Sequence, residues 1–165
     1  MKNYKILVVL VCLIMSSAYT ADDYSKPIPT IKEKTNFEHF IDAVIEVESG
    51  GDDSAIGDRH LGKPSVGCLQ IRPIAVREVN RILEASGVDG KYTLDDRYDR
   101  VRSTEMFMIM AEQVDCCENL SEEEFFEIVA RRWNGGYRGH KKNSTKKYWE
   151  KVKAKYNEKQ TNNNG

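Results

Sequence analysis

An apolar stripe that ends in a carboxylate and two glycines is the feature that most constrains this fold. Apolar side chains recur upstream at three- and four-residue spacing, which predicts an amphipathic helix with one buried face. Glu48 falls four residues after Val44 and three after Ile45, so it continues that buried face. Gly50 and Gly51 follow, and tandem glycine is expected to end the helix in left-handed geometry. The pattern therefore predicts a helix with a carboxylate at its partly buried end.

A carboxyl group in that position is expected to have a raised pKa. Partial burial and the negative end of the helix dipole both disfavour its charged form. A pKa near neutrality is what a general acid requires. The alternative is a frayed helix end with Glu48 turned to solvent, so the choice depends on the rest of the chain.

Charge is distributed unevenly along the 165 residues, although the formal net charge is only -1. The charged residues from 105 to 127 are all acidic, whereas those from 131 to 159 are nearly all basic. The length suits one domain with a substantial core. The basic region could bind an anionic polymer, such as nucleic acid or the carboxylates and phosphates of a bacterial wall. A solvated basic helix is the alternative.

The first residues have the pattern of an export signal. Lys2 and Lys5 precede an apolar run at 6–15, and small residues follow at 16–18. The run is shorter than the ~20 residues that a membrane-spanning helix needs. We therefore expect export to the periplasm, the cell wall or the medium after cleavage, with an uncleaved membrane anchor as the alternative.

Cysteine and histidine usage predicts neither a disulfide framework nor a metal site. Cleavage of the signal would leave Cys68, Cys116 and Cys117, and an odd number of thiols cannot form a complete framework. Small buried thiols are expected, although a bridge from Cys68 to one of the other two stays open. The three histidines are scattered without metal-ligand spacing. No cofactor is expected.

Composition and periodicity divide the chain into four parts. We expect a signal peptide at 1–20, a polar linker at 21–35, a folded domain at 36–158 and a disordered tail at 159–165. Within the domain, Asn36 is expected to cap the first helix and Pro73 to open the second. Ser121 and Glu124 form a capping box for a later helix. The turn-rich segment at 55–66 predicts a short, irregular β-hairpin in a mostly helical domain.

Three glycine-flanked segments carry the candidate binding residues. They lie at 48–51, 67–71 and 132–136, where glycine lets a backbone or a flat ligand approach closely. Gln70 and Asn134 each offer a donor and an acceptor. Trp133 and Tyr137 offer flat faces of the kind on which sugar rings pack. Ser49 and Ile71, next to Glu48 and Gln70, complete the candidate set.

In this order the three segments resemble the soluble-lytic-transglycosylase (SLT)-like members of the lysozyme superfamily, which also includes goose-type lysozymes. That family shows Glu-Ser, then Gly-Leu-Met-Gln, then Ala-Tyr-Asn-Ala-Gly, and this chain has Glu48-Ser49, Gly67-Cys68-Leu69-Gln70 and Arg132-Trp133-Asn134-Gly135-Gly136. The resemblance extends to a small group of phage and bacterial proteins. It spans about residues 37 to 156. It implies a mainly α, lysozyme-like α+β fold: a helical bundle around a substrate cleft, with one small β-hairpin.

The resemblance implies an enzyme that cleaves peptidoglycan between its MurNAc and GlcNAc sugars. Glu48 would protonate the glycosidic oxygen and then act as a base, and the product would be the 1,6-anhydro end formed by a lytic transglycosylase. Gln70 and Asn134 would line the cleft and position the sugar or Glu48. Trp133 replaces the tyrosine of the family, so the hydrogen bond of that hydroxyl must be lost or supplied otherwise.

Two alternatives to the transglycosylase stay open. Asp58 could supply the second carboxylate of a hydrolytic lysozyme, which would require a carboxyl separation of about 5 to 9 Å. Asp58 could equally be a turn residue that accepts backbone N–H bonds. The other alternative is a non-catalytic protein that binds the cell wall. The expected partners are peptidoglycan glycan strands and anionic wall polymers at the basic C-terminal region, with no nucleic acid, and the protein is expected to be a monomer.

Overall fold

The structure is a computed structural model that describes residues 34–114 and 120–163. The expected signal peptide, nearly all of the linker, and Cys116 and Cys117 lie outside the described residues. The chain divides into two units, residues 1–34 and residues 35–165. The described helices all belong to the second unit.

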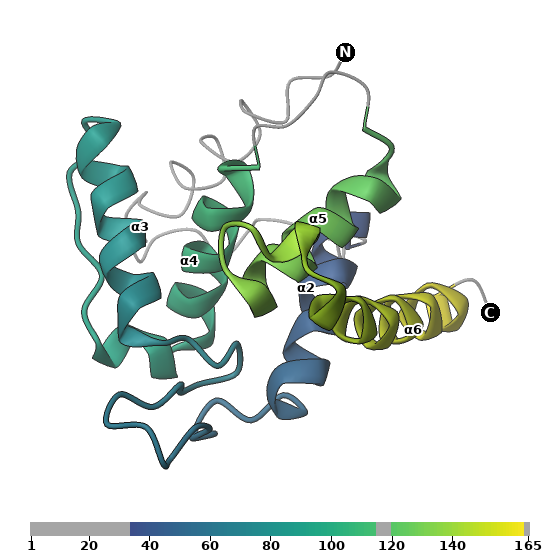
Figure 1. The fold of residues 1–165 in the computed structure, drawn as a ribbon, viewed down its shortest axis with the longest axis horizontal. Helices are drawn as coiled ribbons and strands as arrows, with labels where there is room; N and C mark the ends of the chain where they lie inside the picture. Colours follow the sequence, from purple (N-terminus) through teal and green to yellow (C-terminus); the bar gives the residue numbers. More distant parts are fainter. Residues whose placement is uncertain (1–33, 115–119, 164–165) are drawn as a thin grey trace, which may run out of the picture. The chain divides into compact units, whose positions relative to one another are not determined.

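The second unit is built from helices, which confirms the predicted mainly α fold (Figure 1). Its described α-helices are α2 (Asn36–Ser49), α3 (Pro73–Ala85), α4 (Arg100–Glu112), α5 (Glu122–Gly135) and α6 (Lys146–Asn163). Three short 3-10 helices connect them: η1 (Asp95–Tyr98), η2 (Gly139–Lys141) and η3 (Asn143–Thr145). Within the described ranges, no helix has the length and apolar character needed to cross a membrane.

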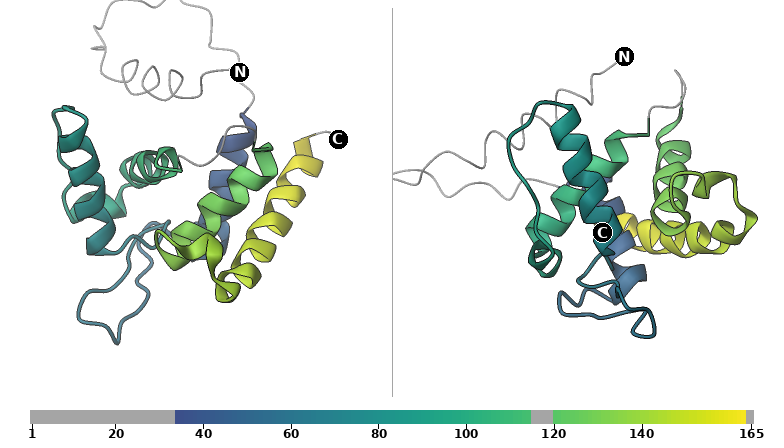
Figure 2. Two further views of the ribbon diagram at one scale, coloured as in Figure 1. Left: turned by 45° about the horizontal axis from the view of Figure 1, so that its top comes forward. Right: turned by 60° about the vertical axis from the view of Figure 1, so that its left-hand side comes forward.

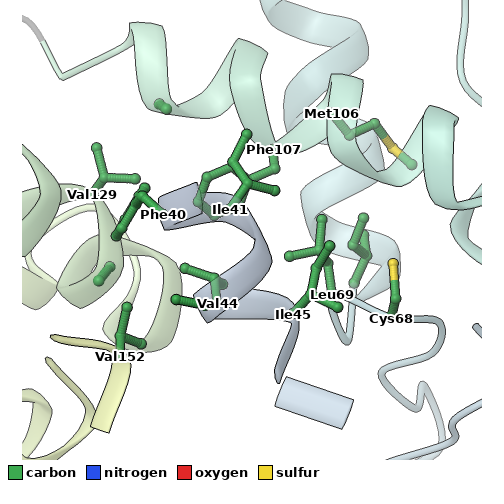
Figure 3. Close-up of a cluster of buried hydrophobic side chains, with 14 of the residues drawn as sticks. Phe40, Ile41, Val44, Ile45, Cys68, Leu69, Met106, Phe107, Val129 and Val152 are labelled. Atoms are coloured by element: carbon green, nitrogen blue, oxygen red, sulfur yellow. The ribbon is translucent and has the colours of Figure 1, made fainter. Parts of the chain in front are cut away.

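Helix α2 supplies the centre of the core. Its buried stripe packs against α4 on one side and against α5 and α6 on the other (Figure 3). Phe40 of α2 is fully buried and stacks on Phe126 of α5, with ring centroids 4.4 Å apart and nearly parallel planes. Phe107 of α4 lies on another side of Phe40. The predicted amphipathic helix is therefore confirmed, and its buried face organises the other helices.

Helix α6 packs along α2 and α5 and is longer than the sequence predicts (Figure 2). It runs through Asn163, so residues 159–163 of the predicted disordered tail are helical. Gln160 donates a hydrogen bond from Nε2 to Asn36 Oδ1 at 3.1 Å, which ties the last turns of α6 to the start of α2. These polar side chains were interpreted as a tail because they carry no apolar stripe.

The segment between α2 and α3, the α2–α3 loop (residues 50–72), contains the predicted short, irregular β-hairpin in a reduced form. It forms only the isolated antiparallel bridges Ile56–Val66 and Val66–Ile71. Gly57 N donates to Ser65 O at 3.0 Å and Gly67 N donates to Ala55 O at 2.9 Å on either side of the first bridge, while other backbone hydrogen bonds close short turns, such as Gln70 N to Gly67 O at 3.0 Å. The turn residues that marked the hairpin fold the segment back several times, so no continuous ladder can form.

The N-terminal cap of α2 is Thr35 rather than the predicted Asn36. Thr35 Oγ1 accepts a hydrogen bond from Glu38 N at 3.2 Å, and the Glu38 carboxylate accepts one from Thr35 N at 2.6 Å. These two bonds form a capping box. Asn36 instead donates its side-chain amide to Glu122 of α5 at 3.0 Å. The box predicted at Ser121 and Glu124 is confirmed.

We expect Thr35→Ala to lower the free energy of unfolding by about 1 kcal/mol, because the backbone N–H of Glu38 loses the hydroxyl that accepts its hydrogen bond. Urea denaturation followed by circular dichroism measures this change. Thr35→Ser keeps the accepting oxygen and serves as the matched control. If Thr35→Ser lowers the free energy of unfolding as much as Thr35→Ala does, the accepting hydroxyl oxygen does not stabilise the helix.

Candidate functional site

The candidate site lies at the C-terminal end of α2, where Glu48 meets Tyr148 of α6. Gly50 follows in the left-handed conformation, with φ of 65°, and ends the helix as predicted. The Glu48 side chain is half-buried, and Tyr148 Oη donates a hydrogen bond to Glu48 Oε1 at 2.6 Å. The bond joins residues that are 100 positions apart in the chain.

The environment of Glu48 raises the pKa of its carboxyl group to about 7. Burial is the largest cause, because it disfavours the charged form. The hydrogen bond from Tyr148 opposes this effect, and the negative charge of Asp58 adds to it. The raised pKa predicted from the helix position is therefore confirmed.

Tyr148 is the residue of this site that sequence analysis missed. Burial and the neighbouring Glu48 raise the pKa of the Tyr148 hydroxyl well above its usual value, so it stays a donor at neutral pH. Its place among the apolar residues of α6 is explained by core packing alone. The available signal was chemical, because a buried tyrosine hydroxyl usually needs a hydrogen-bond partner.

The amide of Gln70 is used inside the α2–α3 loop. Its Nε2 donates to Gly67 O at 2.9 Å and to Ala55 O at 3.3 Å, and its Oε1 accepts from Ser65 Oγ at 3.0 Å. Gly57 lets this amide approach, since a Cβ there would lie 2.2 Å from Gln70 Oε1. Gln70 itself has a φ of 50°, a left-handed value that these contacts hold in place.

Ser49 and Ile71 also serve the loop. Ser49 Oγ donates to the carbonyl of Cys68 at 2.8 Å and so fixes the loop to the end of α2. Ile71 is only 1% exposed and belongs to the core. Ser49 and Ile71, which were predicted to bind a substrate, therefore stabilise the fold instead.

Asp58 lies on the same loop, in the region of Glu48. Its charge contributes to the raised pKa of Glu48, which places the two carboxylates in one electrostatic environment. Asp58 is exposed, has a φ of 48°, and accepts a long hydrogen bond of 3.4 Å from Ser65 Oγ. The positive φ is typical of a turn residue, but the hydrogen bond to the Asp58 carboxylate comes from a side-chain hydroxyl and not from a backbone N–H group, so the interpretation as a backbone-bonded turn residue stays a prediction.

The third glycine-flanked segment, at the end of α5, divides its side chains between core and surface. The ring of Trp133 packs edge-on against Phe107, with centroids 4.8 Å apart. Asn134 is exposed, and Tyr137 is 76% exposed with the Arg132 guanidinium 4.9 Å from its ring centroid. Only Asn134 and Tyr137 therefore remain available to a partner.

Part of the basic C-terminal region is structural. Arg131 is buried, pairs with Glu127, and donates to Thr145 Oγ1 and to Lys142 O at 3.1 Å each. Lys153 pairs with Glu123 of the acidic region. These interactions reduce the number of cations that the region can offer to an anionic polymer.

The described residues contain no cluster of three acidic, cysteine or histidine side chains placed to hold a metal ion. Cys68 is a free buried thiol, and burial raises its pKa to about 11, so it is protonated and unreactive at neutral pH. The predicted buried thiol is confirmed at this position. Cys116 and Cys117 lie outside the described residues.

Fold and site together define a mainly α protein with a carboxyl–phenol pair at the end of its central helix. No family model and no curated protein matches the chain. It is similar to a chain in the crystal structure of Aeromonas hydrophila PliI in complex with Meretrix lusoria lysozyme. The TM-score is 0.53 at 22% identity, over 70% of this chain and 86% of that chain. At this identity the likeness shows a shared fold alone.

The comparisons contradict the predicted enzyme. The assignment as a lytic transglycosylase, a glycosidase and lyase acting on peptidoglycan, depended on the SLT-like motifs, and no family model supports that domain. The similar structure is a complex of PliI with a lysozyme, and no comparison supports a transglycosylase. The geometry offers a physical reason. Gln70 and Ser49 were expected to bind a substrate, but their side chains donate hydrogen bonds to carbonyl groups of the protein's own backbone.

Proposed function

We propose that this chain is a non-catalytic protein that binds a lysozyme. The observation that carries the proposal is its likeness to a chain of the PliI–lysozyme complex. The internal hydrogen bonds of the α2–α3 loop support it, because they make a rigid surface from side chains that a catalytic cleft would expose. Binding a lysozyme outside the cell would also require the export expected from residues 1–20.

The proposed contact surface lies where the α2–α3 loop meets the start of α4. Arg100 Nη2 lies 3.0 Å from Asp53 Oδ1, and the backbone of Gly67 lies directly against the carbonyl of Arg97. Exposed apolar side chains lie on the loop (Ile56), at the end of η1 (Tyr98) and at the start of α4 (Val101). Aromatic and aliphatic side chains on a rigid base are typical of the centre of a protein–protein interface.

The test mixes the full chain with Meretrix lusoria lysozyme and measures complex formation by analytical ultracentrifugation. We expect a defined complex and a stoichiometric fall in the rate at which the lysozyme clears peptidoglycan. Tyr98→Ala is expected to weaken the complex by about ten-fold or more, since truncating an interface tyrosine commonly has this effect. Val88→Ala, which truncates an exposed apolar residue just after α3, is the matched control.

Two results would contradict the proposal. One is the absence of a complex with the lysozyme at about 100 μM of each protein, a concentration that detects even weak association. The other is release of soluble glycan fragments from peptidoglycan by this chain alone, with the release abolished in Glu48→Gln. The second result would show turnover and not merely a different partner.

A further inference from the structure

A cavity of about 490 Å³ lies between α3 and the segment that leads into η1. Helix α3 lines it with Pro73, Val76, Arg77 and Asn80, which recur at helical spacing on one face. The opposite wall is the chain from Tyr92 to Leu94, and Lys63 of the α2–α3 loop stands at the edge. The volume falls in the range of small-molecule sites, about 300–1,000 Å³.

The wall opposite α3 is fixed by hydrogen bonds within the protein. Asn80 Nδ2 donates to Tyr92 O at 2.9 Å, and Tyr92 N donates to Asn80 Oδ1 at 2.8 Å. The Tyr92 hydroxyl donates to Glu105 of α4 at 3.0 Å, and the Arg102 guanidinium lies 4.2 Å from the centroid of its ring. The cavity is therefore formed before any ligand arrives, which lowers the entropy lost on binding.

The lining combines apolar surface with two cations. No carboxylate of the described residues forms an ion pair with Lys63 or Arg77, whereas Arg81, one turn further along α3, pairs with Glu78 at 2.7 Å. The nearby Asp96 carboxylate accepts hydrogen bonds from Thr93 and lies 3.6 Å from Arg102. The positive charge at the cavity is thus not neutralised from within.

Apolar surface remains uncovered beside these cations. Val76 and Pro73 line the cavity from α3 and are buried, while Leu94 lines it from the other wall and is 48% exposed. Ile74, at the start of α3, is also exposed. A ligand that covers this area would remove apolar surface from water, and this burial favours binding by about 25 cal/mol of free energy for each Å² covered.

We propose that this cavity binds a small molecule that joins a carboxylate to an apolar aromatic or aliphatic body. The carboxylate lies against Arg77 and Lys63, where it gains charge-assisted hydrogen bonds. The apolar body lies against Val76, Leu94 and the face of α3. The cavity and the proposed lysozyme-binding surface both include part of the α2–α3 loop, but this proposal does not depend on lysozyme binding.

The test uses naphthoate as the probe and naphthamide, its neutral isostere, as the matched ligand. Each is titrated into the full chain, and amide chemical shifts are followed by NMR. We expect saturable naphthoate binding with a Kd of about 1 mM or tighter, with shifts centred on Val76, Asn80 and Leu94. Naphthamide is expected to bind several-fold more weakly, because it lacks the charge. Shifts spread over the surface, or no saturation, would overturn the proposal.

Two variants locate the charge preference. Arg77→Met is expected to remove most of the preference for naphthoate over naphthamide while leaving the unfolding midpoint unchanged, since Arg77 is exposed. Arg81→Met, on the same helix, is the matched control and is expected to keep the preference. If both variants keep the preference, Arg77 does not recognise the carboxylate and the proposed site is wrong.

Discussion

Replacing Gly67 by alanine is expected to lower the free energy of unfolding by about 2–5 kcal/mol. Gly67 has a φ of 79°, which disfavours any residue with a Cβ. A Cβ built there would also lie 1.8 Å from the carbonyl oxygen of Arg97. That oxygen belongs to the backbone, so relief requires the α2–α3 loop and η1 to move apart. Urea denaturation measures the loss.

Gly50→Ala is the matched control for the Gly67 variant. Gly50 is also left-handed, with φ of 65°, but no atom lies within 4 Å of a Cβ added there. Its substitution carries only the conformational penalty, about 1–2 kcal/mol. The difference between the two variants therefore isolates the close approach of Gly67 to Arg97. Equal losses would show that this contact does not constrain the loop.

The helical part of the fold could be predicted because its signals are local. The stripe that leads to Glu48, the proline that opens α3 and the capping box at Ser121 each depend on residues within a few positions of one another. Burial of Glu48 and the direction of its pKa shift follow from the same local geometry. The N-terminal cap differed by one residue, which is the usual uncertainty of a helix boundary.

The α2–α3 loop shows why the site could be predicted only in part. Glycine marks a place where something approaches the backbone closely, but it does not identify what approaches. At Gly67 the approaching group is a carbonyl thirty residues downstream, and at Gly57 it is the amide of Gln70. A ligand-binding glycine and a packing glycine produce the same sequence pattern. The motif was therefore interpreted as a substrate site, although the side chains serve the fold.

Tyr148 is the residue of the site that the sequence did not predict. The partner of Glu48 lies 100 residues away, on a helix whose apolar spacing explains its burial without reference to any hydrogen bond. Only the packing of α6 along α2 brings the phenol to the carboxyl group. Non-local pairs of this kind depend on the tertiary arrangement, which no periodicity specifies.

The Glu48–Tyr148 pair is expected to make stability fall as pH rises from 4.5 to about 7. In this range the folded protein keeps a proton on Glu48 that the unfolded chain has released. The unfolded state therefore binds fewer protons, and the free energy of unfolding decreases with pH. A rise in the pKa from 4.5 to about 7 limits the total effect to about 3 kcal/mol. Chemical denaturation at a series of pH values measures it.

Glu48→Gln removes the titration, so the stability of the native chain relative to this variant should decline through the same pH range. Glu46→Gln, at an exposed position of the same helix, controls for the loss of one carboxylate. Tyr148→Phe removes a hydrogen bond that lowers the pKa of Glu48, and its decline should therefore extend to higher pH. Parallel profiles for the native chain and Glu48→Gln would place this carboxyl group in open water. The hydrogen bond between Glu48 and Tyr148 would then contribute nothing to stability.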